Sequence, residues 1–234
     1  MPDPFLRTVD LCRYYTRGSH TVRALDGVTV DVLQGELLAV LGSSGSGKTT
    51  LLNLLAGLDT ATSGTVFLGD AALGALSRRQ LSSYRATRVG MIFQSFNLLP
   101  HYSALQNVET ALLFNGTPPR ERRRRAGEML ARVGLGDRMT HRPTDLSGGE
   151  QQRVAVARAV VKNPDILFAD EPTGNLDLEN ARQIAELLTE LNAGGLTVVM
   201  VTHNEEMARR YAHRTIRMEY GRVRLPGTAD GSTS

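Results

Sequence analysis

A glycine-rich run that ends in lysine and threonine offers the clearest chemistry in the sequence: residues 42–49 read Gly-Ser-Ser-Gly-Ser-Gly-Lys-Thr. Glycines let successive backbone N–H groups turn inward around a phosphate, and a helix that starts after the loop adds positive partial charge. Lys48 can reach the β- and γ-phosphates as a compact charge, and the Thr49 hydroxyl can bind Mg²⁺. The run therefore predicts nucleoside triphosphate binding rather than an incidental Gly/Ser-rich loop. The predicted contacts are Gly42, Ser43, Ser44, Gly45, Ser46, Gly47, Lys48, Thr49 and Thr50.

Two acids, Asp170 and Glu171, directly follow the apolar run 166–169. Such a run is typical of a buried parallel strand, and ligands of open α/β sheets bind at the carboxyl ends of these strands. Asp170 is then suited to hold Mg²⁺ through water, and Glu171 to polarise an attacking water. An Asp-Glu pair alone is also common in solvated turns, but the phosphate loop in the same chain favours the catalytic interpretation.

Gln94 and His203 end two further strand-like runs, 89–93 and 196–202. The side-chain carbonyl of Gln94 can complete Mg²⁺ coordination or position water, and the alternative is a polar residue at a strand boundary. His203 follows a β-branched strand, which favours a contact with the γ-phosphate or water over a surface or core role. The candidate catalytic residues are therefore Glu171, His203 and Gln94, and the candidate Mg²⁺ ligands are Thr49, Gln94 and Asp170.

The sequence supplies the elements that must position these groups. Residues 36–41 form a buried-strand run directly before the phosphate loop, and the helix-like segment 50–56 follows it. Residues 4–35 and 64–69 alternate in the β manner between turn glycines, which predicts a small antiparallel sheet beside the nucleotide. Helical patterns are richer from about residue 95 to residue 160.

Length and composition fit one α/β domain of 234 residues, 41% of them apolar and 22% charged. No window approaches the ~20 consecutive apolar residues of a membrane-spanning helix, and the N-terminus has no apolar core of a secretory signal. The single cysteine, Cys12, suggests a reducing compartment. We therefore expect an intracellular protein, with a mobile polar tail at 225–234.

The charges are balanced in number but uneven in type. The net charge is only +3, and of the 27 basic residues only Lys48 and Lys162 are lysine. The run Arg120 to Arg125 is typical of a solvated helix face, and contact with anionic lipid headgroups is the alternative. Nucleic-acid binding is not expected, because aromatic residues make up 5% of the chain and offer no stacking platform.

A second small-residue turn stands before a helix-like apolar stretch at 154–161. The turn, Ser147 to Gly149, is suited to bind an anion at a helix N-terminus. With Glu150 it belongs to the run Leu-Ser-Gly-Gly-Glu-Gln-Gln-Arg at 146–153, which resembles the signature motif of the ATP-binding subunits of ABC transporters.

The other motifs of that family follow in the family's order, and the resemblance covers about residues 5–223. Residues 42–49 resemble the Walker A loop, Gln94 the Q-loop glutamine, Asp170 the Walker B aspartate, Glu171 the catalytic glutamate, Asp177 the D-loop aspartate and His203 the switch histidine. Tyr15 resembles the aromatic residue that stacks on adenine, with the adjacent Tyr14 as the alternative.

The resemblance implies an α/β fold: a P-loop NTPase (RecA-like) core with an antiparallel β subdomain and an inserted helical subdomain at about 95–160. The whole chain, 1–234, is then one ABC ATP-binding domain. The resemblance also implies ATP and Mg²⁺ as ligand and cofactor, with ATP hydrolysis coupled to transport. Two copies would close on two ATP, with residues 147–150 completing the partner's site. A separate transmembrane permease would hold the pair at the cytoplasmic face of a membrane.

Three stretches of the sequence indicate which branch of the ABC family the chain resembles most: Gly57-Leu58-Asp59, residues 96–100 and residues 171–177. Together they look most like the ATPases of the lipoprotein-release and macrolide-export branch. Polar amino-acid importers are similar at 96–100 but generally have Ser-Ala-Leu-Asp where this chain has Gly-Asn-Leu-Asp, at 174–177. The export branch is therefore expected, and the alternatives are an importer ATPase or a non-transport ABC ATPase.

Overall fold

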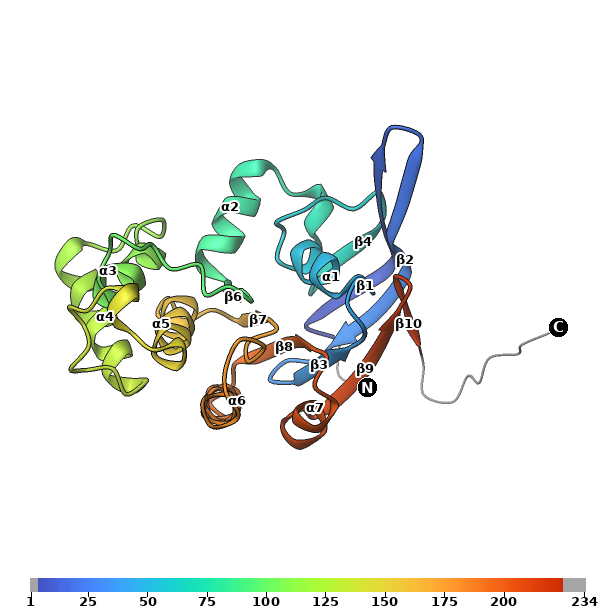
Figure 1. Ribbon diagram of the computed structural model, residues 1–234. Coiled ribbons are helices and arrows are strands. Elements are labelled where there is room, and N and C mark those ends of the chain that lie inside the picture. Colours follow the sequence, from blue (N-terminus) through green and yellow to red (C-terminus); the bar gives the residue numbers. More distant parts are fainter. Residues whose placement is uncertain (1–3, 225–234) are drawn as a thin grey trace.

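The computed structural model describes residues 4–224, so the predicted tail lies outside the described residues. The larger of two β-sheets has the strand order β10-β9-β3-β8-β7-β6 (Figure 1). All neighbouring pairs are parallel except β9 and β10, so the carboxyl ends of the other strands meet at one edge. The strands are β3 (Leu37–Leu41), β6 (Val89–Ile92), β7 (Ile166–Asp170), β8 (Thr197–Thr202), β9 (Arg214–Glu219) and β10 (Arg222–Arg224).

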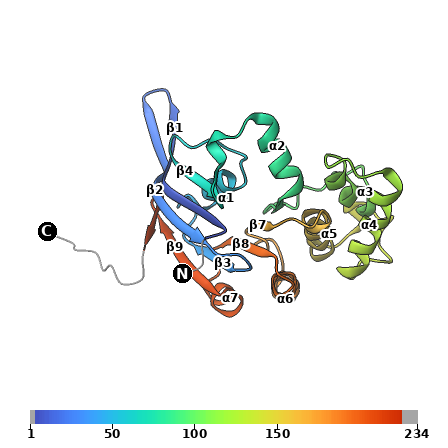
Figure 2. The same ribbon diagram turned by 180° about the vertical axis from the view of Figure 1, so that it is seen from behind.

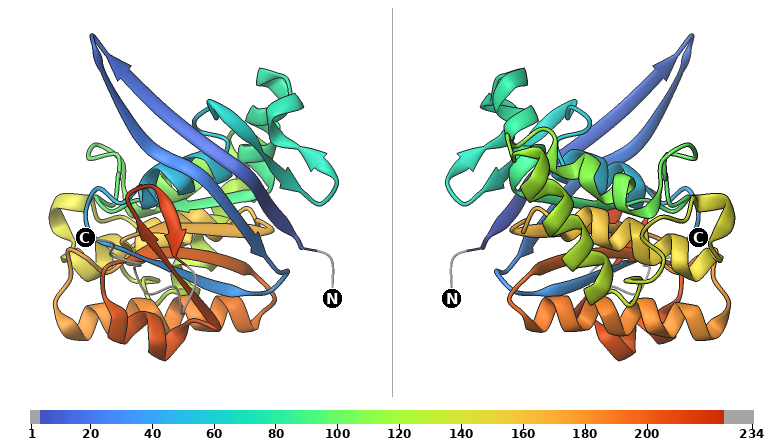
Figure 3. Two further views of the ribbon diagram at one scale, coloured as in Figure 1. Left: turned by 90° about the vertical axis from the view of Figure 1, so that its right-hand side faces the viewer. Right: turned by 90° about the vertical axis from the view of Figure 1, so that its left-hand side faces the viewer.

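Both faces of this sheet are covered, as its near-continuous apolar strands predict. On β3, Leu38 and Val40 pack in one hydrophobic cluster with α1 (Lys48–Leu55). Leu37 and Ala39 point the other way, into a cluster with α6 (Leu178–Ala193) and α7 (Glu205–Tyr211). Figure 3 shows α6 and α7 lying along that face. The sequence analysis identified neither of these two helices.

The second sheet is antiparallel, as predicted from residues 4–35 and 64–69, and has the order β2-β1-β4-β5. Leu25 and Val28 of β2 enter the same cluster as α1, which fixes this sheet beside the start of that helix. The β1–β2 hairpin extends well beyond the rest of the molecule (Figure 3). Its strands are β1 (Leu6–Arg17), β2 (His20–Val32), β4 (Ser63–Leu68) and β5 (Ala71–Ala72), and the short helix η1 (Leu73–Ala75) follows β5.

A group of helices lies at the end of the molecule opposite the β1–β2 hairpin (Figure 2). Leu105, Leu130 and Val154 belong to a hydrophobic cluster of their own there. Val156 and Val160 belong instead to the cluster on the six-stranded sheet, so α5 joins the two regions. The elements are α3 (Ala104–Glu109), η2 (Thr110–Leu112), α4 (Pro119–Arg132), η3 (Pro143–Asp145) and α5 (Gly148–Val160).

One helix, α2 (Arg78–Thr87), precedes the range in which helical patterns were expected. Ser77 and Gln80 form a reciprocal capping box at its start, and this Ser-x-x-Gln pattern is the sequence signal that could have identified the helix. Within residues 4–224, no helix combines the length and apolar composition that crossing a bilayer requires.

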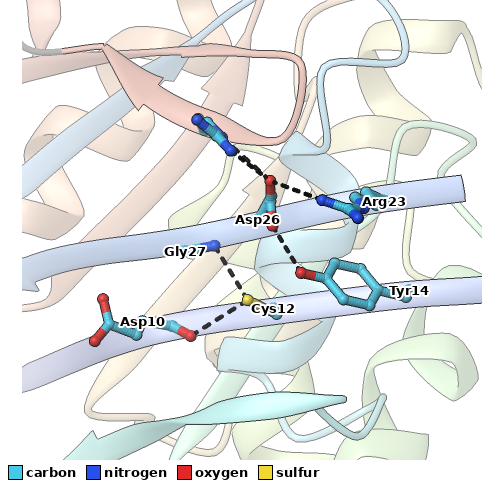
Figure 4. A network of polar contacts seen from close by, with 7 residues as sticks. Asp10, Cys12, Tyr14, Arg23, Asp26 and Gly27 are labelled. Carbon is cyan, nitrogen blue, oxygen red and sulfur yellow. Dashed lines mark hydrogen bonds and ion pairs between the residues drawn. The ribbon is translucent and has the colours of Figure 1, made fainter.

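A polar network ties the antiparallel sheet to the β9–β10 turn (Figure 4). Asp26 of β2 accepts hydrogen bonds from the Tyr14 hydroxyl and from Arg222, both 2.7 Å long. These donors hold the pKa of Asp26 below its usual value, and the same contact raises the pKa of Tyr14 to about 12. The Asp26 N–H donates to the Gly221 carbonyl, and the Gly221 N–H donates to the carbonyl of Ser46 in the glycine-rich loop. The network therefore connects both sheets to the predicted phosphate loop.

Candidate functional site

A cleft of about 600 Å³ opens at the carboxyl edge of the six-stranded sheet, where β3, β6, β7 and β8 end. It brings together most of the residues predicted from separate parts of the sequence. The predicted residues that line it are Ser44, Gly45, Ser46, Gly47, Lys48, Thr49, Thr50, Gln94, Asp170, Glu171 and His203. Gly42 and Ser43 lie at the far side of the same loop, in an adjoining hollow of about 350 Å³.

The loop between β3 and α1 folds around the amino group of Lys48. This group donates to the carbonyl oxygens of Gly42 and Ser43, across 2.8 and 2.9 Å, and the residue is only 7% exposed. The buried hydroxyl of Ser46 has no hydrogen-bond partner among residues 4–224. A buried cation and an unpaired hydroxyl beside the start of a helix are suited to an anion.

Gly47 is the tightest point of the loop. It has φ 101°, and an added Cβ would lie 2.3 Å from the carbonyl oxygen of Ala24 in β2. Gly45 has φ 77° but open space around its Cα. Only Gly47 therefore combines a left-handed backbone with close contact to the antiparallel sheet.

We expect Gly47→Ala to destabilise the protein more than Gly45→Ala does. Gly45→Ala carries backbone strain alone, roughly 1–2 kcal/mol, whereas Gly47→Ala adds a clash with Ala24 that costs a further ~1–3 kcal/mol. Denaturant unfolding of the two variants measures the difference. Equal losses of unfolding free energy would show that contact with the antiparallel sheet does not restrict the loop.

Asp170 and Thr49 provide oxygen atoms at the floor of the cleft. The Thr49 hydroxyl donates to Asp170 Oδ1 across 3.2 Å. Burial raises the pKa of the Asp170 carboxyl, and the charge of Glu171 adds to the rise. A divalent cation would balance this buried carboxylate, and carboxylate, hydroxyl and amide oxygens are ligands that Mg²⁺ accepts. The residues present, with Gln94 on the same cleft, therefore fit Mg²⁺.

Glu171 and His203 meet although they end different strands. Glu171 has φ 46°, a conformation that costs energy outside glycine. Its N–H donates to the Val201 carbonyl of β8, and its carbonyl accepts from the Gly174 N–H, each across 3.0 Å. Its Oε2 lies 3.0 Å from His203 Nδ1. Oε2 is nevertheless buried without a hydrogen-bond partner among residues 4–224. The fold thus places an unpaired carboxylate oxygen beside the imidazole on a strained backbone, which is typical of a functional site.

The segment that carries Gln94 is held at two points that the sequence analysis did not identify. Asn175 donates to the backbone carbonyl of Gln94 across 2.8 Å. Arg158 of α5 donates to the carbonyls of Phe96 and Asn97, which have φ 34° and 51°. These partners are 81, 62 and 61 positions apart in sequence, and no local pattern points from one to the other. Gln94 is therefore anchored both to the loop after Glu171 and to the helical region.

The second predicted anion-binding turn does not line this cleft. Ser147 and Glu150 form a reciprocal capping box at the start of α5, in which the Ser147 N–H donates to Glu150 across 2.8 Å. That bond holds the pKa of Glu150 below its usual value. An added Cβ on Gly149 would lie 2.0 Å from Asn180 Oδ1, and Asn180 also donates to Asp177 at the start of α6. Residues 147–150 and Asp177 therefore form a second group, apart from the phosphate loop.

The hydroxyl groups of the two candidate tyrosines, Tyr14 and Tyr15, have different partners, and neither tyrosine lines the cleft. The Tyr15 hydroxyl donates to Asp59 across 2.7 Å, whereas that of Tyr14 is engaged by Asp26. Tyr15 is 41% exposed, and its pairing partner on β2 is Val22, which does line the cleft. Tyr15 thus stands one strand away from the cleft wall.

Tyr220 and Arg23 line the cleft without having been predicted. Tyr220 is 88% exposed in the turn between β9 and β10, and the adjoining Gly221 bonds to the loop. No sequence signal marks a tyrosine near the C-terminus for this place, because only the pairing of β9 with β3 brings it there.

Three features define the class of protein: parallel strands covered on both faces, a glycine-rich loop that runs from β3 into α1, and two acids at the end of β7, with β8 between the two strands. They are those of a P-loop nucleoside triphosphatase. Comparison with known proteins shows to which family of these nucleoside triphosphatases the chain belongs. The sequence profile of the ABC transporter family matches residues 25–174. The chain belongs to this family, and it is an ATP-binding, ATP-hydrolysing subunit.

Two relatives illustrate the branch. An uncharacterized ABC transporter ATP-binding protein of Thermotoga maritima is 48% identical over 86% of each chain. The macrolide export ATP-binding/permease protein MacB of Brucella melitensis is 43% identical over 94% of this chain, which spans only 34% of MacB. The resemblance to the export branch predicted from the sequence is thereby confirmed.

Solved structures agree with the fold. The ATP-binding cassette MJ0796, in a dimeric post-hydrolysis state bound to ADP and Pi, superposes with a TM-score of 0.87 and 39% identity. The match covers 94% of this chain and 97% of that one. The predicted P-loop NTPase fold is therefore confirmed.

Proposed function

We propose that two copies of this chain close on two ATP molecules and thereby drive a separate membrane permease of the export or lipoprotein-release kind. The observation that carries the proposal is the position of the α5 N-terminus, an anion-binding turn outside the chain's own cleft. Residues 147–150 do not line the chain's own cleft, so this turn would contact a nucleotide only if that nucleotide is bound in the cleft of a second copy. The dimeric form of the similar cassette bound to ADP and Pi supports this arrangement.

In each composite site, one copy supplies the phosphate loop and the acids, and the other supplies residues 147–150. Lys48 would exchange its two loop carbonyls for phosphate oxygens. Thr49, Asp170 and Gln94 would hold Mg²⁺, which neutralises phosphate charge when bound. Glu171 would orient the attacking water and accept its proton. His203, whose Nδ1 lies 3.0 Å from Glu171 Oε2, would contact the γ-phosphate or that water. Tyr15 would stack on adenine, and Asp177 would extend to the partner's site.

Hydrolysis would then open the dimer, because the γ-phosphate joins the loop of one copy to the turn of the other. In this scheme the chain is one ABC ATP-binding domain, 1–234, with a helical subdomain at about 95–160. MacB combines ATP-binding and permease functions in one protein. By analogy, this chain would bind its permease at the cytoplasmic face of the membrane, beside Gln94 and the helical subdomain.

Co-purification tests the transport part of the proposal. The tagged chain, extracted with its membrane in a mild detergent, is expected to retain the multi-spanning permease encoded next to its gene. The permease should also change the rate of ATP hydrolysis. If the chain leaves the membrane fraction without any permease under these conditions, the transport proposal is wrong.

A further inference from the structure

Asp59 ties the hydroxyl end of Tyr15 to the far end of the helix that follows the phosphate loop. The Tyr15 hydroxyl donates to Asp59 Oδ2 across 2.7 Å. Asp59 lies just beyond the end of α1, where its N–H and that of Leu58 donate to the Asn53 carbonyl across 3.3 and 2.8 Å. Because α1 begins at Lys48, one helix carries the phosphate-binding amino group at its start and supports the tyrosine at its end.

Arg13 of β1 covers one face of the Tyr15 ring. Its guanidinium carbon lies 4.5 Å from the ring centroid, a distance at which a cation and an aromatic face attract each other. The same guanidinium pairs with Asp59 through two nitrogens: Nε donates to Oδ2 across 2.9 Å, and Nη2 lies 2.8 Å from Oδ1. Bidentate pairs of this kind fix direction as well as distance. The guanidinium is therefore held in place against the ring.

The three side chains form a closed group in which each contacts the other two, and this group leaves one face of the Tyr15 ring for a ligand. Tyr15 is 41% exposed and is paired with Val22 of β2, which lines the cleft. Directly paired residues of antiparallel strands point to the same face of their sheet. A base that extends from the cleft past Val22 would therefore reach the ring on the face that Arg13 leaves open.

A ring that is already fixed binds a base at a lower entropic cost than a ring that turns freely. An exposed tyrosine without partners would lose side-chain freedom when a base stacks on it. Tyr15 has its hydroxyl held by Asp59 and one face held by Arg13 before any ligand is bound. Such preorganisation increases affinity without adding a contact to the ligand.

We infer that Arg13 and Asp59 are positioning residues for the nucleotide base: they hold the Tyr15 ring at a fixed place relative to the phosphate loop, so that one ligand contacts both. The inference rests on the proposed stacking of adenine on Tyr15 and adds the pair that orients the ring. Its consequence depends on the ligand. ATP, which has a base as well as phosphates, gains affinity from the pair, whereas inorganic triphosphate does not.

Arg13→Met tests the inference, because methionine keeps an apolar stem and removes the guanidinium. Calorimetric titration of the isolated chain with ATP and Mg²⁺ is expected to show about threefold to tenfold weaker binding, the effect of uncoupling residues in contact. Inorganic triphosphate with Mg²⁺ should bind as it does to the unchanged chain. Arg7→Met is the matched control: Arg7 lies on the same strand, 5.2 Å from the Phe67 ring, and its loss should leave both affinities unchanged.

Two further variants complete the experiment. Asp59→Asn keeps the shape of the side chain and removes its charge, so it should show the same selective loss, and it replaces Arg13→Met if that variant does not fold. Tyr15→Ala should weaken ATP binding about fivefold to a hundredfold, the range of base–aromatic stacking. Adding Arg13→Met to Tyr15→Ala should cost no further affinity, because the guanidinium acts through the ring.

The outcomes separate the inference from the proposed function. The inference is overturned if Arg13→Met and Asp59→Asn bind ATP as tightly as the unchanged chain, or if they lose affinity for ATP and inorganic triphosphate equally. It is also overturned if the losses of Arg13→Met and Tyr15→Ala add up in the double variant. Normal ATP affinity of Tyr15→Ala would instead show that the proposed stacking is wrong, and the inference with it.

Discussion

Glu171→Gln is expected to lower ATP turnover roughly a hundredfold or more while leaving ATP binding intact, as loss of a general base does. The side chain is 12% exposed, and its Oε2 lies 3.0 Å from His203 Nδ1. Glutamine has nearly the same shape, so the strained backbone and the cleft wall should persist, but an amide does not accept a proton from water. Phosphate release and ATP-binding titrations on the same preparation measure the two quantities.

The same variant should accumulate as an ATP-bound dimer, because the step that opens the dimer is blocked. Light scattering with and without ATP and Mg²⁺ detects the change in mass. Glu206→Gln is the matched control: it makes the same chemical change at an exposed position of α7 and should hydrolyse ATP normally. Normal turnover by Glu171→Gln would remove this residue from the catalytic role. A monomer at saturating ATP, with the permease also present, would exclude the composite site.

Lys48→Ala is expected to weaken ATP binding by roughly tenfold to a hundredfold, because charge-assisted hydrogen bonds are worth about 1.5–3 kcal/mol. The amino group is the buried cation of the loop and has two carbonyl contacts to exchange for phosphate. At an ATP concentration that saturates only the unchanged chain, closure should weaken as well, since fewer copies would hold a γ-phosphate that joins them. Titration with a fluorescent ATP analogue measures the affinity.

The chain offers a close control for that experiment. Lys162 is the only other lysine, and Lys162→Ala in the isolated chain should leave ATP affinity unchanged. Lys48→Met keeps the apolar stem of the side chain and separates lost charge from lost packing. If Lys48→Met binds ATP as tightly as the unchanged chain, the phosphate role of Lys48 is wrong.

Those parts of the site that are local in the chain could be predicted from residue type and spacing. Residues 42–49 bring the glycines, the lysine and the threonine together in eight consecutive positions, which run from the end of β3 into the start of α1. Asp170 and His203 could be placed at one edge because parallel strands present their carboxyl ends together. The capping boxes at 147–150 and 77–80 are also local patterns, but the sequence analysis identified neither of them and used only the small-residue turn at 147–149.

Contacts between segments far apart in the chain could not be predicted from the sequence, because they depend on how the strands and helices pack. The 3.0 Å approach of His203 to Glu171 depends on the register of β7 against β8. The anchoring of Gln94 by Asn175 depends on packing across 81 positions. The partners of Tyr14 and Tyr15 were likewise undetermined, because adjacent tyrosines carry the same local signal and only their neighbours in space differ. Residue type and spacing specify which chemistry is present, whereas strand register and side-chain packing specify which groups meet.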